Sequence, residues 1–305
     1  MIGVLISWIV HCLLILLSVA FFTLFERKVI GLFHNRLGPN KVSIVGVLQP
    51  LLDAFKLLTK QSLTPLHSNK LVYNLTPHLS LFFALFTWIT IPLFYRIFNL
   101  SYSFLIFFCI RSIMVFAVLL TGWSSNSKYS LIGSLRSIAQ SISYEAVLRT
   151  LMVLFVFVII SFSISRFYTL SSLIFLFLLP VWFVRILAET HRAPFDFRES
   201  ESELVSGFNT EYSGAYFAFL FLSEYAMLLF ACFLIAVIFF SFLSLFLALN
   251  VYFLISLSLL ISFLFIWVRI TYCRFRYDLL IIFAWKRMLP FSLISFIFFS
   301  LISFI

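Results

Sequence analysis

Long apolar runs, separated by short polar stretches, extend through the whole chain. A helix that crosses the hydrocarbon core of a bilayer, about 30 Å thick, needs about 20 residues at a rise of 1.5 Å per residue. Eight runs reach this length once the uncharged stretch from Tyr225 to Val268 is divided between Ser241 and Asn250. The pattern predicts eight transmembrane helices, at about residues 1–25, 71–95, 97–127, 135–164, 167–184, 215–241, 250–268 and 288–305.

A second pattern, with the period of an amphipathic helix, lies between the first two runs. Apolar residues recur from Ile44 to Leu58, and a polar stripe carries Gln49, Asp53, Lys56 and Lys60 at spacings of 4, 3 and 4. We therefore expect a surface helix over about residues 44–60, lying on the membrane or under a partner protein. Pro50 falls inside the pattern, so the helix should begin or kink there. A simple interfacial anchor is the alternative interpretation.

A polar stretch from Glu189 to Gly214 carries six of the eleven acidic residues between two apolar runs. As a helix beginning after Pro194, it would place Asp196, Glu199 and Glu203 on one face. Carboxylates this close repel one another and titrate as a coupled group, whereas the neighbouring arginines oppose that effect. The alternative is a solvated helix start with Asp196 as its N-cap.

Composition supports a single integral membrane domain over residues 1–305. The chain is 63% hydrophobic and 10% charged, which excludes an ordinary soluble domain and predicts an all-α polytopic membrane protein. Its four cysteines are scattered singly, so an iron–sulfur or zinc site within the chain is not expected. The first apolar run has no basic region before it, so we expect no cleavable targeting segment.

Charge is distributed unevenly between the two faces that this topology creates. Loops after the odd-numbered spans, with their flanks, hold 17 of the 21 basic residues. Basic loops face the inner side of a membrane. Because the number of spans is even, both termini lie on the opposite side. The concentration of charged residues on the basic face predicts that the partners bind there.

Two acidic residues, Glu145 and Glu224, lie about ten residues inside predicted spans. An ionised carboxylate at such a depth costs on the order of 3 kcal/mol, so these residues favour a proton or cation pathway. Arg149 follows Glu145 at the i,i+4 spacing, and a buried salt bridge is the alternative for that pair. Glu224 has no basic residue near it in sequence.

Seven motifs make the chain resemble the family of subunit 1 of mitochondrial NADH:ubiquinone oxidoreductase, respiratory complex I. They are FERKVIG (25–31), RLGPNKV (36–42), VLQPLLDAFKLLTK (47–60), GWSSNSKYSLIGSLRSIAQSISYE (122–145), AETHRAPFDF (188–197), ESELVSGFNTEY (201–212) and RFRYD (274–278). The resemblance implies a subunit without a redox centre that forms the membrane half of the ubiquinone chamber and couples quinone reduction to proton translocation. Its eight-helix topology agrees with the hydrophobic pattern.

The resemblance also implies roles for individual residues. Those expected to line or support the quinone chamber are Arg27, Arg36, Asp53, Arg192, Asp196, Glu199, Glu201, Glu203 and Arg274. Those expected in the proton pathway are Tyr144, Glu145, Glu189, Glu211, Tyr212 and Glu224. Implied partners are the peripheral-arm quinone-module subunits on the matrix face, the small membrane-arm subunits, ubiquinone and membrane lipids, without nucleic acid. FMN and iron–sulfur clusters would lie on partner subunits. The location implied is the mitochondrial inner membrane, with both termini in the intermembrane space.

Some positions depart from the family pattern. Arg111 and Arg149 stand where apolar or small residues are common, and a fixed ion pair with Arg149 would hold Glu145 charged. Ser200 and Cys273 replace the usual Gly and Pro. The alternative functions are a secondary ion transporter, a quinone-free hydrogenase-type membrane subunit, and a purely structural anchor. We find no inverted repeat in the sequence, which argues against a transporter. A structural anchor does not explain a carboxylate such as Glu224 within a span.

Overall fold

The computed structural model describes residues 2–91, 100–159, 161–164, 176–197, 207–246 and 250–304. All regular structure in these ranges is helical. The main helices are α1 (Ile2–Phe33), α2 (Gln49–Thr59), α3 (Lys70–Thr87), α4 (Ser103–Ser124), α5 (Lys128–Ile159), α7 (Leu179–Glu189), α9 (Gly214–Phe246), α10 (Asn250–Thr271), α11 (Tyr277–Phe283) and α12 (Leu289–Phe304). Single turns η1 (Ile44–Gly46), η2 (Trp88–Thr90), η4 (Leu176–Leu178) and η5 (Gly207–Asn209), and the π-helix η6 (Ala284–Met288), complete the described structure.

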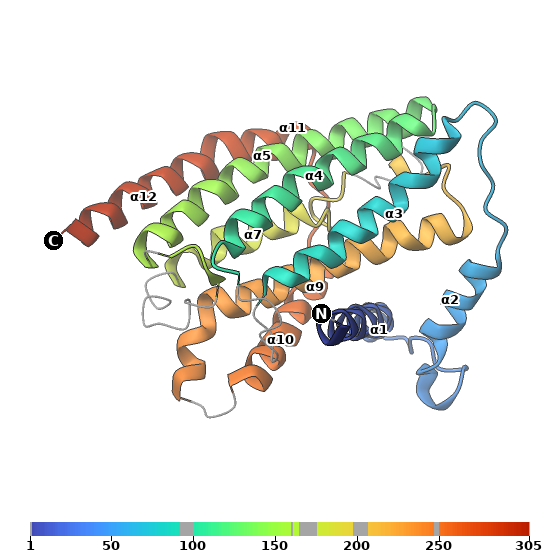
Figure 1. Cartoon of the computed structure of the whole chain (residues 1–305), viewed down its shortest axis with the longest axis horizontal. Helices are drawn as coiled ribbons and strands as arrows, with labels where there is room; N and C mark the ends of the chain where they lie inside the picture. Colours follow the sequence, from blue (N-terminus) through green and yellow to red (C-terminus); the bar gives the residue numbers. More distant parts are fainter. Residues whose placement is uncertain are drawn as a thin grey trace.

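The helices form one bundle around α9. Helices α3, α4, α5 and α12 lie side by side, α9 packs against α3 and α10, and α1 crosses below α9 (Figure 1). Large side chains fill the centre, among them Phe155 of α5, Trp182 of α7 and Phe239 of α9, all nearly or fully buried. Within the described ranges, six helical segments are long and apolar enough to cross a membrane: α1, α4, α5, α9, α10 and the continuous stretch from α11 to α12. The expected all-α polytopic membrane fold is therefore confirmed.

Most predicted spans coincide with a helix. The second span corresponds to α3, and the division of the long uncharged stretch falls between α9 and α10 as predicted. The first half of the fifth span, residues 167–175, lies outside the described residues, and its second half coincides with η4 and the start of α7. Helices α1, α5 and α9 have apolar side chains around most of their circumference, which is why hydropathy located them.

Helix α1 is longer than predicted, since it ends at Phe33 and not at Phe25. Its end is a Schellman motif: Asn35 has a left-handed φ of 54°, its amide donates to Leu32 O, and the Arg36 amide donates to Gly31 O at 2.9 Å. The charged residues after Phe25 are good helix formers, so they do not end the helix. As a result, Glu26 is part of the helix and faces the bundle.

The surface helix is shorter than the pattern suggested. Helix α2 begins at Gln49 with Pro50 in its first turn, which confirms the role predicted for the proline. The preceding residues cannot continue the helix, because Val45 and Gly46 have φ values of 60° and 77°. A side chain at residue 46 would also meet Pro39 O at 2.2 Å, so this turn requires glycine.

The helix expected after Pro194 does not begin there. Residues 193–195 form a turn and residues 196–197 are irregular, while 198–206 lie outside the described residues. The reason is that the carbonyls which a helix would need are already engaged. Pro194 O accepts from the Phe275 amide at 3.0 Å, and Phe195 O accepts from Gln140 Nε2 at 2.9 Å. Whether Asp196 caps a helix remains a prediction, because the residues that would form that helix, 198–206, lie outside the described residues.

Gln140 of α5 fixes this turn against the bundle. Its side chain is fully buried, and Nε2 donates to both Ala188 O (2.7 Å) and Phe195 O (2.9 Å). Gln140→Leu removes the side-chain donor from both carbonyls, which keep only the backbone amides of His191 (3.4 Å) and Phe197 (3.1 Å), and each lost hydrogen bond costs about 0.5–1.5 kcal/mol. We expect a large fall in the amount of assembled complex, measured on native gels, whereas Gln61→Leu in the exposed loop after α2 has no such effect. Normal assembly of Gln140→Leu would contradict this role.

Candidate functional site

A buried carboxylate, Glu26 of α1, gathers two arginines and a tyrosine. Arg192 Nη1 donates to Glu26 Oε1 at 3.0 Å, Arg269 of α10 donates to the same oxygen, and the Tyr225 hydroxyl donates to Oε2 at 2.7 Å. The Arg192 guanidinium also lies over the Tyr225 ring, 4.3 Å from its centroid. We call these four residues the Glu26 cluster. It joins α1, α9, α10 and the loop after α7.

The electrostatics of the Glu26 cluster keep Arg192 charged. Burial by itself would lower the pKa of Arg192, but the Glu26 carboxylate and Tyr225 oppose this effect and raise that pKa above its ordinary value. Glu26 is 5% exposed, so its charge depends on these partners. Sequence reasoning placed Arg192 in the site and missed Glu26. The available signal was an acidic residue directly following an apolar run.

A small cavity of about 50 Å³ lies beside the Glu26 cluster. It contains polar groups from the loop after α7, from α9 and from α10, and one wall carries Asp196. Arg274 approaches Asp196 at 3.5 Å, so these two predicted site residues lie together at the cavity edge. The lining residues are His191, Arg192, Ala193, Asp196, Phe221, Glu224, Tyr225 and Arg269.

A second cavity, of about 70 Å³, shares Glu224 and His191 with the first. Its other polar lining includes Arg111, Glu189 and several hydroxyl groups. A space of this size with polar groups in its lining can hold water molecules. Glu224 is the carboxylate that borders both cavities.

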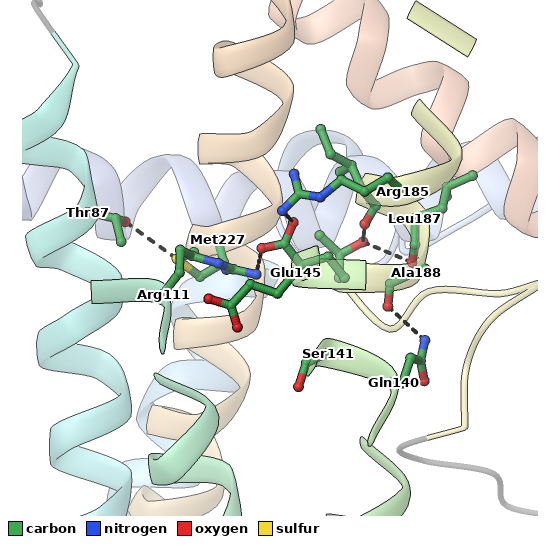
Figure 2. A network of polar contacts seen from close by, with 12 residues as sticks. Thr87, Arg111, Gln140, Ser141, Glu145, Arg185, Leu187, Ala188 and Met227 are labelled. Carbon is green, nitrogen blue, oxygen red and sulfur yellow. Dashed lines mark hydrogen bonds and ion pairs between the residues drawn. The ribbon is translucent and has the colours of Figure 1, made fainter. Parts of the chain in front are cut away.

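Figure 2 shows the charged group at the far side of the second cavity, where Arg111 of α4 and Arg185 of α7 approach from opposite sides and Glu145 lies beside Arg111. Both arginines form ion pairs with Glu189, one with each carboxylate oxygen. Arg149 pairs with Glu145 at 2.6 Å, as the i,i+4 spacing predicted, but the pair is not buried, since the Arg149 side chain is 59% exposed. Arg185 was not predicted as a site residue, although it lies one helical turn before Glu189.

The aromatic residues predicted for the proton pathway lie elsewhere. The Tyr212 ring stacks on Tyr73 with centroids 4.3 Å apart, and its hydroxyl contacts Ser124 Oγ at 3.1 Å. Burial raises the pKa of Tyr212, so this phenol is neutral at physiological pH. Glu211 accepts a hydrogen bond from Tyr73 through its backbone carbonyl, and the Tyr144 hydroxyl donates to a carbonyl of α11 at 3.4 Å. None of Tyr144, Glu211 and Tyr212 is among the described residues that line the two cavities.

The surface helix contacts α1 through its polar stripe. Arg27 Nη1 and Asp53 Oδ2 are 2.6 Å apart, and Gln49 Nε2 donates to the other Asp53 oxygen at 2.9 Å. Arg36 follows the end of α1 and is exposed. The remaining predicted chamber residues, Glu199, Glu201 and Glu203, lie outside the described residues.

Comparisons with known proteins show the family to which the chain belongs. A model of the NADH dehydrogenase family matches residues 6–300. The chain is 46% identical to NADH-ubiquinone oxidoreductase chain 1 of Aedes aegypti over 287 residues, which cover 92% of this chain and 89% of that protein. It is 44% identical to the chain of the same name from Heterololigo bleekeri over 311 residues, with 98% and 96% coverage. For the Tetraodon nigroviridis chain the identity is 43% over 286 residues, with 92% and 88% coverage. The chain therefore belongs to the NADH dehydrogenase family, as a chain 1-type membrane subunit of NADH-ubiquinone oxidoreductase.

Proposed function

We propose that this subunit forms the membrane half of the ubiquinone chamber and couples quinone reduction to proton translocation in the mitochondrial inner membrane. The observation that carries the proposal is Glu224, which borders the cavity beside the Glu26 cluster and the cavity that reaches Glu189. Reduction of a quinone to a quinol takes up two electrons and two protons. A buried carboxylate between two polar cavities can relay such protons.

The residues of this chain would position the quinone and balance its charge, whereas partner subunits would supply the electrons. FMN and iron–sulfur clusters on those subunits would deliver the electrons. The peripheral-arm quinone-module subunits would bind on the matrix face. The small membrane-arm subunits and membrane lipids would surround the helices. In this arrangement the Glu26 cluster and the Asp196–Arg274 pair form a charged wall that responds to the charge of the reduced quinone.

The contact between α2 and α1 supports a chamber entrance. Asp53 lies on the polar stripe and bonds Arg27, whereas the apolar stripe, including Phe55 and Leu58, is exposed. A lipid-facing apolar stripe and a polar stripe turned toward α1 suit a passage for an amphipathic quinone. This arrangement favours the chamber over a simple anchor, since an anchor requires only the apolar stripe.

We predict that Asp53→Asn lowers quinone reductase activity several-fold while the complex still assembles. The Arg27–Asp53 pair is partly exposed, with side chains 54% and 34% accessible, so it adds no more than about 1 kcal/mol to stability. Activity with a short-chain quinone and binding of a quinone-site inhibitor are measured on the same preparation. Lys56→Gln, which removes a charge from the same helix without touching this pair, serves as the control.

The outcome separates the two interpretations of α2. Weaker inhibitor binding with normal assembly supports the chamber. Loss of assembled complex with normal specific activity in the remainder would support the anchor and contradict the chamber.

A further inference from the structure

Glu189 is held between two arginines at the end of the second cavity. Arg111 Nη2 pairs with Oε1 and Arg185 Nη2 pairs with Oε2, so each carboxylate oxygen has its own guanidinium. All three side chains are buried or nearly so, with accessibilities of 16% for Arg111, 3% for Arg185 and 10% for Glu189. The Arg185 guanidinium also lies over the Trp182 ring, 5.3 Å from its centroid, which fixes its position.

This geometry opposes protonation of Glu189. A proton on the carboxylate would leave two buried guanidiniums facing one another without an anion between them, which is costly at this degree of burial. Arginine does not lose its proton under physiological conditions, so it cannot relieve the repulsion. The carboxylate is therefore the only group of the three that can balance the charge.

The neighbouring charges strengthen the argument. Helix α5 contributes Glu145 and Arg149, which form their own pair, and α9 and the loop after α7 contribute Glu224 and His191 across the cavity. The three arginines are matched by the three carboxylates Glu145, Glu189 and Glu224 only when all three carboxylates are ionised. Protonation of Glu189 would leave a net positive charge on the group, so the arginines favour its anionic form.

We propose that Arg111 is a positioning residue which, with Arg185, keeps Glu189 ionised, so that Glu189 is a fixed counter-ion and not a proton carrier. The proposal rests on the proposed proton-coupling function and narrows it. Proton exchange at the second cavity is assigned to Glu224 and the water that the cavity can hold. Glu189 maintains the field in which that exchange takes place.

The test combines infrared difference spectroscopy with the pH profile of quinone reduction, both on the assembled complex. The single variant Glu189→Gln should show the same protonated-carboxyl bands as the wild type, because an ionised Glu189 contributes no such band. Arg111→Met removes one guanidinium and should add such a band, which the double variant Arg111→Met/Glu189→Gln loses again. The acid limb of the Arg111→Met pH profile should move to higher pH by about one unit or more.

Two further variants distinguish positioning from general damage. Arg111→Lys keeps the positive charge and should retain the wild-type limb, and Arg287→Met removes an exposed cation of η6 and should not shift it. A protonated-carboxyl band that Glu189→Gln removes from the wild-type spectrum would overturn the proposal. So would an Arg111→Met profile that superimposes on wild type. If the Arg111→Met complex does not assemble, the infrared spectra of the wild type and Glu189→Gln still show whether Glu189 carries a proton.

Failure of the broader function gives a different result. Normal proton pumping by the Glu224→Gln complex would contradict the proposed role of this subunit in proton coupling. The infrared comparison would still report whether Glu189 carries a proton, because it measures the carboxyl group directly.

Discussion

Glu26→Gln should abolish most of the quinone reductase activity of the complex and lower the amount that assembles. Glu26 accepts hydrogen bonds from Arg192, Arg269 and Tyr225, and it is the carboxylate between the two guanidiniums. A glutamine of the same shape removes the charge and leaves these arginines uncompensated. Breaking a buried ion pair in this way costs about 3–5 kcal/mol. Native gels and quinone reductase assays on solubilised membranes measure both effects.

The control for Glu26→Gln makes the same chemical change at the surface. Asp278 pairs with Arg276 at 3.2 Å, but the two side chains are 65% and 80% exposed, so Asp278→Asn should change stability by no more than about 0.5 kcal/mol. Wild-type assembly and activity in Glu26→Gln would show that the Glu26 cluster is required neither for stability nor for quinone reduction.

Glu224→Gln should reduce electron transfer and proton pumping together, by about tenfold or more. Glutamine keeps the volume and the hydrogen-bonding capacity of the side chain but has no proton to exchange, and general acid–base groups typically contribute about 10²–10⁴-fold. Glu224 is the carboxylate that borders both cavities, so no other carboxylate in their described lining replaces it directly. NADH:quinone activity and acidification are measured in the same vesicles.

Glu224→Asp provides the matched comparison. It restores the titratable proton on a shorter side chain, so we expect partial recovery of both activities. Quinone reduction and pumping at wild-type levels in Glu224→Gln would remove the residue from the proton pathway. Loss of pumping with full electron transfer would contradict the tight coupling that the proposal assumes.

Several features could be predicted from the sequence because they depend on local spacing. Hydrophobic runs located the long helices, Pro50 marked the start of α2, and the i,i+4 spacing gave the Glu145–Arg149 pair at 2.6 Å. Each of these signals lies within one continuous segment of the chain. A pattern along one segment is sufficient to detect it.

The features that were missed depend on contacts between distant segments. Glu26 meets Arg192 and Arg269 across 166 and 243 residues, and no periodicity within α1 reveals those partners. The predicted helix does not begin directly after Pro194, for a related reason. The carbonyls of Pro194 and Phe195 are bonded by Phe275 and Gln140, and local spacing cannot anticipate that competition.

The charges around Glu189 show where chemical reasoning was incomplete. Arg111 appeared in the sequence as an isolated charge within a span, without an identifiable partner. In the bundle it meets Glu189 of another helix, and Arg185 supplies the second cation. An intramembrane charge requires a partner, but only the packing of α4 against the rest of the bundle shows which residue that partner is.

The most direct test of the proposed chamber is a density map of the assembled complex with ubiquinone bound. The account predicts quinone density that enters between α1 and α2 and contacts the Glu26 cluster or the turn that contains Asp196. Quinone density that touches no residue of this chain would contradict it.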